Sequence, residues 1–223
     1  MGFKRDIADL IAEVRAIADM ENTQFVTDDQ INLWLNAAYR ELYNMLINSY
    51  ELYNIATDDI TTVSGTKDYA LPADFLKLIK VFYVSSDGRE YPLTRMNLHT
   101  ADTYAFRDSE VSKYVLLGNN LRLWPIPNTG KTIRIYYNPA ATVFAKTDTD
   151  IDFEQHQDEF CIVSAAVKCL EKEQTPTTEL MTDRERLRKQ CLSAIEPRDV
   201  SDSLQIADVT YAPFTNWWAR GWH

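Results

Sequence analysis

Apolar residues recur every three or four positions near the start of the chain, and this spacing predicts an amphipathic helix. The repeat consists of Ile7, Leu10, Ile11, Val14 and Ile17. A longer repeat follows behind the sequence Thr27-Asp28-Asp29-Gln30. This sequence predicts a capping box, in which the Thr27 side chain meets the amide of Gln30 and the Gln30 side chain reaches back to the amide of Thr27.

The second repeat predicts a long helix that runs to about Ser49 and would be roughly 33 Å long at 1.5 Å per residue. Its inward stripe consists of Ile31, Trp34, Leu35, Ala38, Leu42, Met45 and Leu46. The other faces carry polar residues that we expect to meet solvent: Asn32, Asn36, Arg40, Glu41, Asn44 and Asn48. The two helices are expected to form an antiparallel pair.

The middle of the chain is rich in β-branched and aromatic residues that are separated by turn signals. We expect strands at residues 60–63, 68–71, 76–84, 90–93, 114–117, 121–124 and 132–137. Asp87-Gly88 and Asn119-Asn120 each predict the turn of a hairpin. A short helix is expected within residues 94–106.

The helical period returns at about Asp152. The first predicted helix carries Phe160, Val163, Ala166, Val167 and Leu170, and the second, opened by Pro176, turns inward Leu180, Leu187, Cys191 and Ile195. The predicted fold class is therefore α+β, mainly an α-helical bundle of two helical hairpins with a β-rich insert at about 55–140. We divide the chain into a core of residues 1–196 and an extended C-terminal tail of residues 197–223.

Composition restricts the class of function. With 223 residues, of which 45% are hydrophobic, the chain fills a core without its C-terminal end. A net charge of −10 disfavours a protein that clamps nucleic-acid phosphates, but not one that DNA slides past. Neither a signal peptide nor a membrane span is predicted. The acidic sets are read either as solvated loops or as a surface that repels DNA: Asp58-Asp59, Asp148-Asp150-Asp152 and Asp199-Asp202.

One cluster has residue types suited to metal binding or acid–base chemistry: Glu154, His156, Asp158 and Glu159. Helical spacing would place Glu154 and Asp158 on one face. Acids are also favoured in the first turn of a helix by its dipole, and we expect this structural role. The three cysteines are expected to be small buried residues. No catalytic, metal-binding or phosphate-binding motif occurs, so we expect no enzyme activity, no cofactor and no metal.

Aromatic residues are concentrated at the C-terminal end. A polar run from Arg198 to Asp208 lacks helical periodicity and precedes five aromatic residues: Tyr211, Phe214, Trp217, Trp218 and Trp222. Because Trp and Tyr give a large contact area at low entropic cost, this pattern predicts a partner-docking segment. About 27 extended residues would reach roughly 90 Å. The alternative is a tail that folds back onto its own core.

The order of these features resembles tailed-phage (podovirus-like) head-to-tail adaptor or connector proteins over about residues 5–195. The resemblance is carried by residues 27–32 (TDDQIN), 35–38 (LNAA), 68–75 (DYALPADF), 92–93 (PL), 121–127 (LRLWPIP) and 135–139 (IYYNP). It implies a structural virion protein, made in the host cytoplasm, that forms a ring of about twelve subunits under the portal.

The same resemblance implies the partners: the portal protein, neighbouring adaptor subunits and the tail nozzle or tail-tube proteins, with DNA passing through the lumen without specific binding. It also implies that a C-terminal segment docks on the portal, and we assign this role to Tyr211, Phe214, Trp217, Trp218 and Trp222. Two alternatives remain from the residues themselves. One is a virion-associated peptidoglycan-cleaving enzyme with Glu154 or Asp158 as general acid. The other is a monomeric scaffold with an aromatic docking tail.

Overall fold

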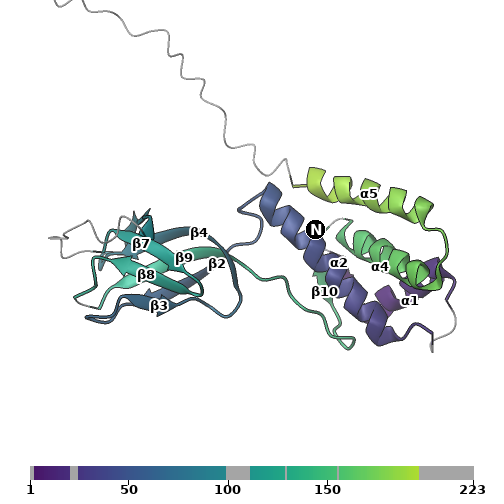
Figure 1. Cartoon of the computed structure of the whole chain (residues 1–223), viewed down its shortest axis with the longest axis horizontal. Helices are drawn as coiled ribbons and strands as arrows, with labels where there is room; N and C mark the ends of the chain where they lie inside the picture. The colour runs from purple at the N-terminus through teal and green to yellow at the C-terminus, as the bar shows by residue number, and fades with distance from the viewer. Residues whose placement is uncertain (1–2, 21–24, 99–110, 129, 155, 196–223) are drawn as a thin grey trace, which may run out of the picture.

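The computed structural model describes residues 3–20, 25–98, 111–128, 130–154 and 156–195. It shows helices at one end and strands at the other (Figure 1). The helices are α1 (Ile7–Ala18), α2 (Asp28–Ser49), α4 (Gln157–Glu173) and α5 (Thr178–Ser193). We call these four helices the helical part. The two sheets formed between Ala56 and Pro139 are called the β part.

The long helix α2 begins and ends where its sequence predicts. Thr27 is its N-cap, and the Thr27 hydroxyl accepts a hydrogen bond from the Gln30 amide at 3.3 Å. The second half of the predicted capping box is replaced by a tertiary contact, because Gln30 Oε1 accepts a hydrogen bond from Lys172 Nζ at 2.8 Å. Lys172, in the last turn of α4, therefore ties the end of one helix to the start of another.

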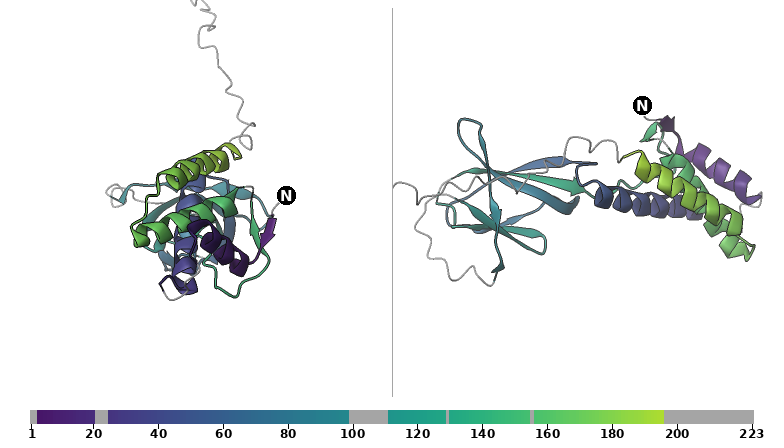
Figure 2. Two further views of the ribbon diagram at one scale, coloured as in Figure 1. Left: turned by 90° about the vertical axis from the view of Figure 1, so that its right-hand side faces the viewer. Right: turned by 90° about the horizontal axis from the view of Figure 1, so that it is seen from above.

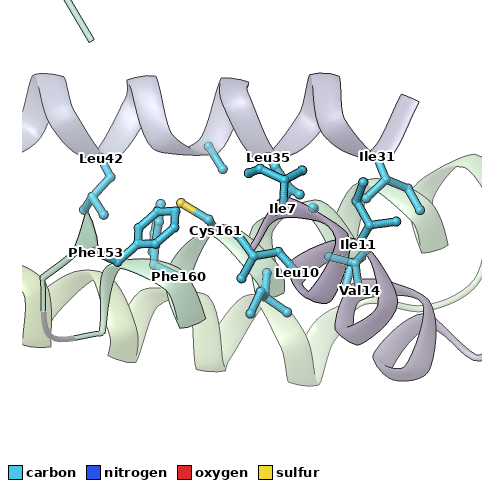
Figure 3. Packing of buried hydrophobic residues seen from close by; sticks show 14 of the residues in the cluster. Ile7, Leu10, Ile11, Val14, Ile31, Leu35, Leu42, Phe153, Phe160 and Cys161 are labelled. Atoms are coloured by element: carbon cyan, nitrogen blue, oxygen red, sulfur yellow. The ribbon is translucent and has the colours of Figure 1, made fainter. Parts of the chain in front are cut away.

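Helix α4 lies at the centre of the helical part, where it packs against α1, α2 and α5 (Figures 1 and 2). Figure 3 shows Ile7, Leu10, Leu35 and Phe160 in the space between the helices, and all four are fully buried. α1 makes more of its contacts with α4 than with α2, so the expected antiparallel pair is mediated largely by a third helix. Ile17 is not part of this core, because its side chain is 43% exposed.

The prediction that Asn36 faces solvent was wrong. Its side chain is 6% exposed and hydrogen-bonds the backbone of Phe144, accepting from the amide at 2.7 Å and donating to the carbonyl at 3.0 Å. Asn32 adds a hydrogen bond to the same carbonyl at 3.2 Å. A buried backbone group needs such a partner, and Phe144 lies in a loop that has no strand neighbour to supply one.

The β part consists of two four-stranded sheets that enclose one apolar core, in which Leu121, Leu123, Ile133 and Ile135 are fully buried. One sheet has the order β2 (Ala56–Thr61), β9 (Thr132–Pro139), β4 (Phe75–Val84), β5 (Glu90–Pro92). The other has the order β3 (Asp68–Ala70), β8 (Asn120–Trp124), β7 (Lys113–Leu117), β6 (Thr94–Arg95).

At both margins of the β part the chain passes from one sheet to the other. The edge strand β2 continues into the edge strand β3, and β5 continues into β6 through Leu93. This arrangement leaves short edges, which limits unwanted pairing with other strands. The β7–β8 turn lies at Gly118-Asn119, one residue before the predicted position, because Gly118 adopts a positive φ of 57°.

The fold is mixed α+β, as predicted, but it holds more β structure than a mainly helical bundle. Two strands account for part of the difference. Thr94 and Arg95 form β6, in place of the start of a short helix, and the rest of that predicted helix lies mostly outside the described residues. The helical period also begins later than Asp152, because β10 (Ile151–Phe153) pairs with β1 (Phe3–Arg5).

Candidate functional site at the junction of the two parts

The cluster of Glu154, His156, Asp158 and Glu159 does not form a paired-carboxylate site. Glu154 precedes α4, and its Oε2 accepts a hydrogen bond from the Tyr53 hydroxyl at 3.1 Å. Asp158 lies in the first turn of α4 and forms an ion pair with Arg5 at 3.2 Å. His156 is the N-cap residue and lies 3.4 Å from Glu159. Among the described residues, no group of three His, Cys, Asp or Glu side chains could hold a metal ion.

The carboxylate of Asp158 fastens the N-terminal strand to the helical part. Its side chain is only 12% exposed, and Arg5, which faces it, also pairs with Glu13 of α1. Asp158 therefore keeps the expected favourable position near the helix N-terminus and gains a tertiary ion pair that the sequence did not indicate.

All three cysteines are buried, as predicted. Burial raises the pKa of Cys169 to about 11 and that of Cys191 to about 12, and it raises the pKa of Cys161 as well. A thiol with such a pKa is protonated at neutral pH, and the protonated form is a poor nucleophile. Their positions in α4 and α5 are those of small core residues.

A polar network fixes the connection between the helical part and the β part. The Tyr43 hydroxyl in α2 donates to the carbonyl of Pro139 at 2.7 Å and accepts from Asn54 Nδ2 at 3.3 Å. Asn138 is fully buried, and its Nδ2 donates to the carbonyls of Glu51 at 2.9 Å and Asn54 at 2.7 Å. The end of β9 is thereby bound to the segment that leaves α2.

A second set of contacts closes the same junction from the side of β4. The Tyr137 hydroxyl donates to Asp74 Oδ1 at 3.0 Å, and the amide of Ala140 donates to the Asp74 carbonyl at 2.6 Å. The ring of Phe75 packs on that of Tyr137 with centroids 5.6 Å apart. Burial raises the pKa of Tyr137 to about 12, so its hydroxyl keeps the proton that this hydrogen bond needs.

The junction gives a structural role to two of the sequences that carry the family resemblance. Residues 68–75 supply Asp74 and Phe75, and residues 135–139 supply Tyr137, Asn138 and Pro139. Sequence reasoning assigned Pro139 to the end of a strand and did not detect the network, because its partners are separated by about 60 to 100 positions. The concentration of Tyr, Asn and Asp next to prolines was the available signal.

A groove of about 200 Å³ lies between α2, α4 and α5. Trp34, Val167 and Met181 supply apolar surface, and Arg184 forms part of the rim. Arg184 donates to Ser164 at 3.0 Å and pairs with Glu41, and its guanidinium lies 5.3 Å from the Phe160 ring centroid. A second, open groove runs along the outer face of α5, and Met181 borders both grooves.

The five aromatic residues proposed for docking, Tyr211, Phe214, Trp217, Trp218 and Trp222, lie outside the described residues. No described helix is long and apolar enough to cross a membrane. No curated protein matches the chain. The family described as SU10 adaptor protein matches residues 5–210, a range that includes the whole junction network and both parts. The chain therefore belongs to the SU10 adaptor protein family, which confirms its resemblance to phage head-to-tail adaptors.

Proposed function

We propose that the protein is a structural head-to-tail adaptor of a tailed-phage virion. About twelve subunits would form a ring under the portal, extend the DNA channel and present a surface to the nozzle or tail-tube proteins. The observation that carries this proposal is the family match over residues 5–210. The junction network supports it, because a connector subunit must hold its two parts at one angle.

The division of labour in the chain follows from the same match. We propose that residues 1–196, with the β insert at about 55–140, form the body of the ring, and that residues 197–223 dock on the portal. The family match ends one residue before Tyr211, so the five aromatic residues belong to the segment that differs from the shared pattern. A segment that recognises one particular portal is expected to differ in this way.

Magnitudes indicate that tryptophan burial alone does not hold such a segment in place. Ordering about 27 residues costs roughly 27–54 kcal/mol of backbone entropy. A buried Trp covers roughly 150–250 Å², worth about 4–6 kcal/mol at 25 cal/mol/Å². Three tryptophans offset less than half of the cost. Docking therefore requires a partner that adds backbone hydrogen bonds and further apolar contact.

The charge of the chain suits a lumen through which DNA passes. The described basic side chains are largely engaged by acids, as in the pairs Arg134–Asp59, Arg122–Asp68 and Lys4–Asp150. Paired bases bind phosphates weakly, since each contact must first give up a carboxylate partner. We therefore propose that DNA slides past without specific binding, as the net charge of −10 indicates.

The alternative of a peptidoglycan-cleaving enzyme has less support. Its proposed acids, Glu154 and Asp158, bind Tyr53 and Arg5 in separate structural contacts. We propose that the protein has no catalytic activity. Release of soluble muropeptides from purified peptidoglycan by the protein, above a heat-treated control, would contradict this assignment.

The docking proposal is tested with purified portal particles of the same phage. The full chain alone is expected to sediment as a monomer or small oligomer and to form rings on portal particles in negative-stain images. Truncation after Glu196 should abolish ring formation and leave the melting temperature nearly unchanged. Alanine at Trp217, Trp218 and Trp222 should weaken binding almost as much.

A matched control separates recognition from mere shortening of the tail. Alanine at Asp202, Ser203 and Gln205 changes three polar tail residues and should leave portal binding intact. If truncation unfolds the protein, the tail belongs to the core and the docking role is wrong. If the full chain fails to bind the portal, the adaptor proposal itself fails.

A further inference from the structure

The four described helices differ in the sign of their charge. α5 carries four basic and three acidic side chains, a net charge of +1. α1 has a net charge of −1, and α2 and α4 each have −2. In a chain with a net charge of −10, α5 is thus the one described helix that is net basic. Its exposed side chains include Arg186, Lys189 and Met181.

The opposite charge gathers around α1. Residues 148–152 lie against the start of this helix, since the Asp150 amide donates to Asp6 and β10 pairs with β1. Within residues 4–19 and 148–152, seven acidic side chains stand against three basic ones, a net charge of −4. The outward side of α1 exposes Asp9 and Ala12 and ends in the 43% exposed Ile17.

These two surfaces lie on different sides of the helical part. α4 packs against both α1 and α5, and Figures 1 and 2 show α5 on the side of α4 away from α1. A ring built from identical subunits requires two different surfaces that fit each other, because each copy meets its neighbours head to tail. A net basic face and a net acidic face on opposite sides of one chain meet this requirement.

We propose that the outer face of α5 in one copy of this chain binds the α1 face of the next copy. Met181 and Ile17 would supply apolar contact, with Arg186 and Lys189 facing the acidic surface around Asp9. This inference rests on the proposed ring for its biological role, but the contact is a property of the two faces and is tested without the portal.

Charge reversal on either face provides the test. One variant, R186E/K189E, makes α5 acidic, and a second, D9K/A12K, makes the α1 face less acidic. Neither touches the Arg5–Glu13 or Arg184–Glu41 pair, and Arg186 and Lys189 are more than half exposed, so the fold should persist. Circular dichroism and melting curves check this point for each variant.

Two variants that each disfavour contact with themselves should bind each other. Fluorescence anisotropy of labelled R186E/K189E at low ionic strength should show binding to D9K/A12K on the order of tenfold tighter than binding to itself. High salt should remove the difference, because exposed charges are screened. The control K67E/K80E makes the same charge change on the β part, and it should bind D9K/A12K less tightly than R186E/K189E does.

The outcomes separate this contact from the adaptor proposal. Equal binding of D9K/A12K by R186E/K189E and by K67E/K80E would overturn the contact, whether or not the unmodified protein forms rings on the portal. Selective pairing of the variants together with no portal binding by the unmodified protein would support the contact and contradict the adaptor function. An equal mixture of the two variants should also restore rings that each variant alone fails to form.

Discussion

Replacing Asn36 by Ala tests whether one buried amide holds the loop that returns from the β part. The substitution removes the acceptor of the Phe144 amide at 2.7 Å and one donor to the Phe144 carbonyl at 3.0 Å. Asn32 Nδ2 still reaches that carbonyl at 3.2 Å, so the buried N–H of Phe144 is the group left without a partner. The ring of Phe144 stays close to Tyr39 and Phe153, which limits how far the loop can move to find water.

The magnitude follows from this inventory. An orphaned buried N–H costs about 1–3 kcal/mol, and the lost hydrogen bond to the carbonyl adds about 0.5–1 kcal/mol. The higher helix propensity of Ala returns about 0.5 kcal/mol. We expect a net loss of about 2 kcal/mol in the free energy of unfolding. For a protein of this size that lowers the melting temperature by roughly 4–8 °C.

Thermal and urea unfolding followed by circular dichroism measure this loss, with N44A as the matched control. Asn44 is an exposed asparagine of the same helix, so its replacement should be neutral or slightly stabilising. Equal stabilities of N36A and N44A would refute the reasoning. A further variant, N36D, should be destabilised at neutral pH and recover as the pH falls, because a protonated carboxyl group can again donate to the Phe144 carbonyl.

Three further outcomes are expected. Replacing Asp158 by Asn should cost about 2 kcal/mol in urea unfolding, since it leaves the largely buried Arg5 without a partner, whereas E159Q, which changes a mostly exposed side chain, should cost less than about 0.5 kcal/mol. Hydrogen bonds from Arg134 and Arg122 lower the pKa values of Asp59 and Asp68; their contribution is complete above the unfolded carboxyl pKa of about 4 and is lost as the pH falls through the lower folded values, so D59N/D68N should flatten the acid side of a stability–pH curve. None of the three cysteines should react with a thiol reagent at pH 8 in the native protein, and all three should react after denaturation; a fast-reacting thiol in the native state would show that the α4–α5 core opens.

The sequence alone determined the elements whose signals are local. The helical repeats behind Thr27 and around Phe160 gave α2 and the centre of α4, because one apolar face repeated over several turns has few other solutions. Asp87-Gly88 marked a hairpin for a similar reason, since Gly88 adopts the positive φ of 82° that the turn requires. The order of these local sequences was also sufficient to recognise the family.

Tertiary structure alone decided which polar residues are buried and what they hold. Asn36 has the same local context as Asn44, yet one binds Phe144 across 108 positions and the other faces solvent. Glu154 and Asp158 are four positions apart, but β10 delays the helix and sends their carboxylates to different partners. The junction between Tyr43, Asp74, Tyr137 and Asn138 likewise arises only when segments distant in sequence meet. Hydrophobic periodicity records which face of an element is buried, whereas a hydrogen bond depends on which distant group arrives opposite, and no local pattern contains that information.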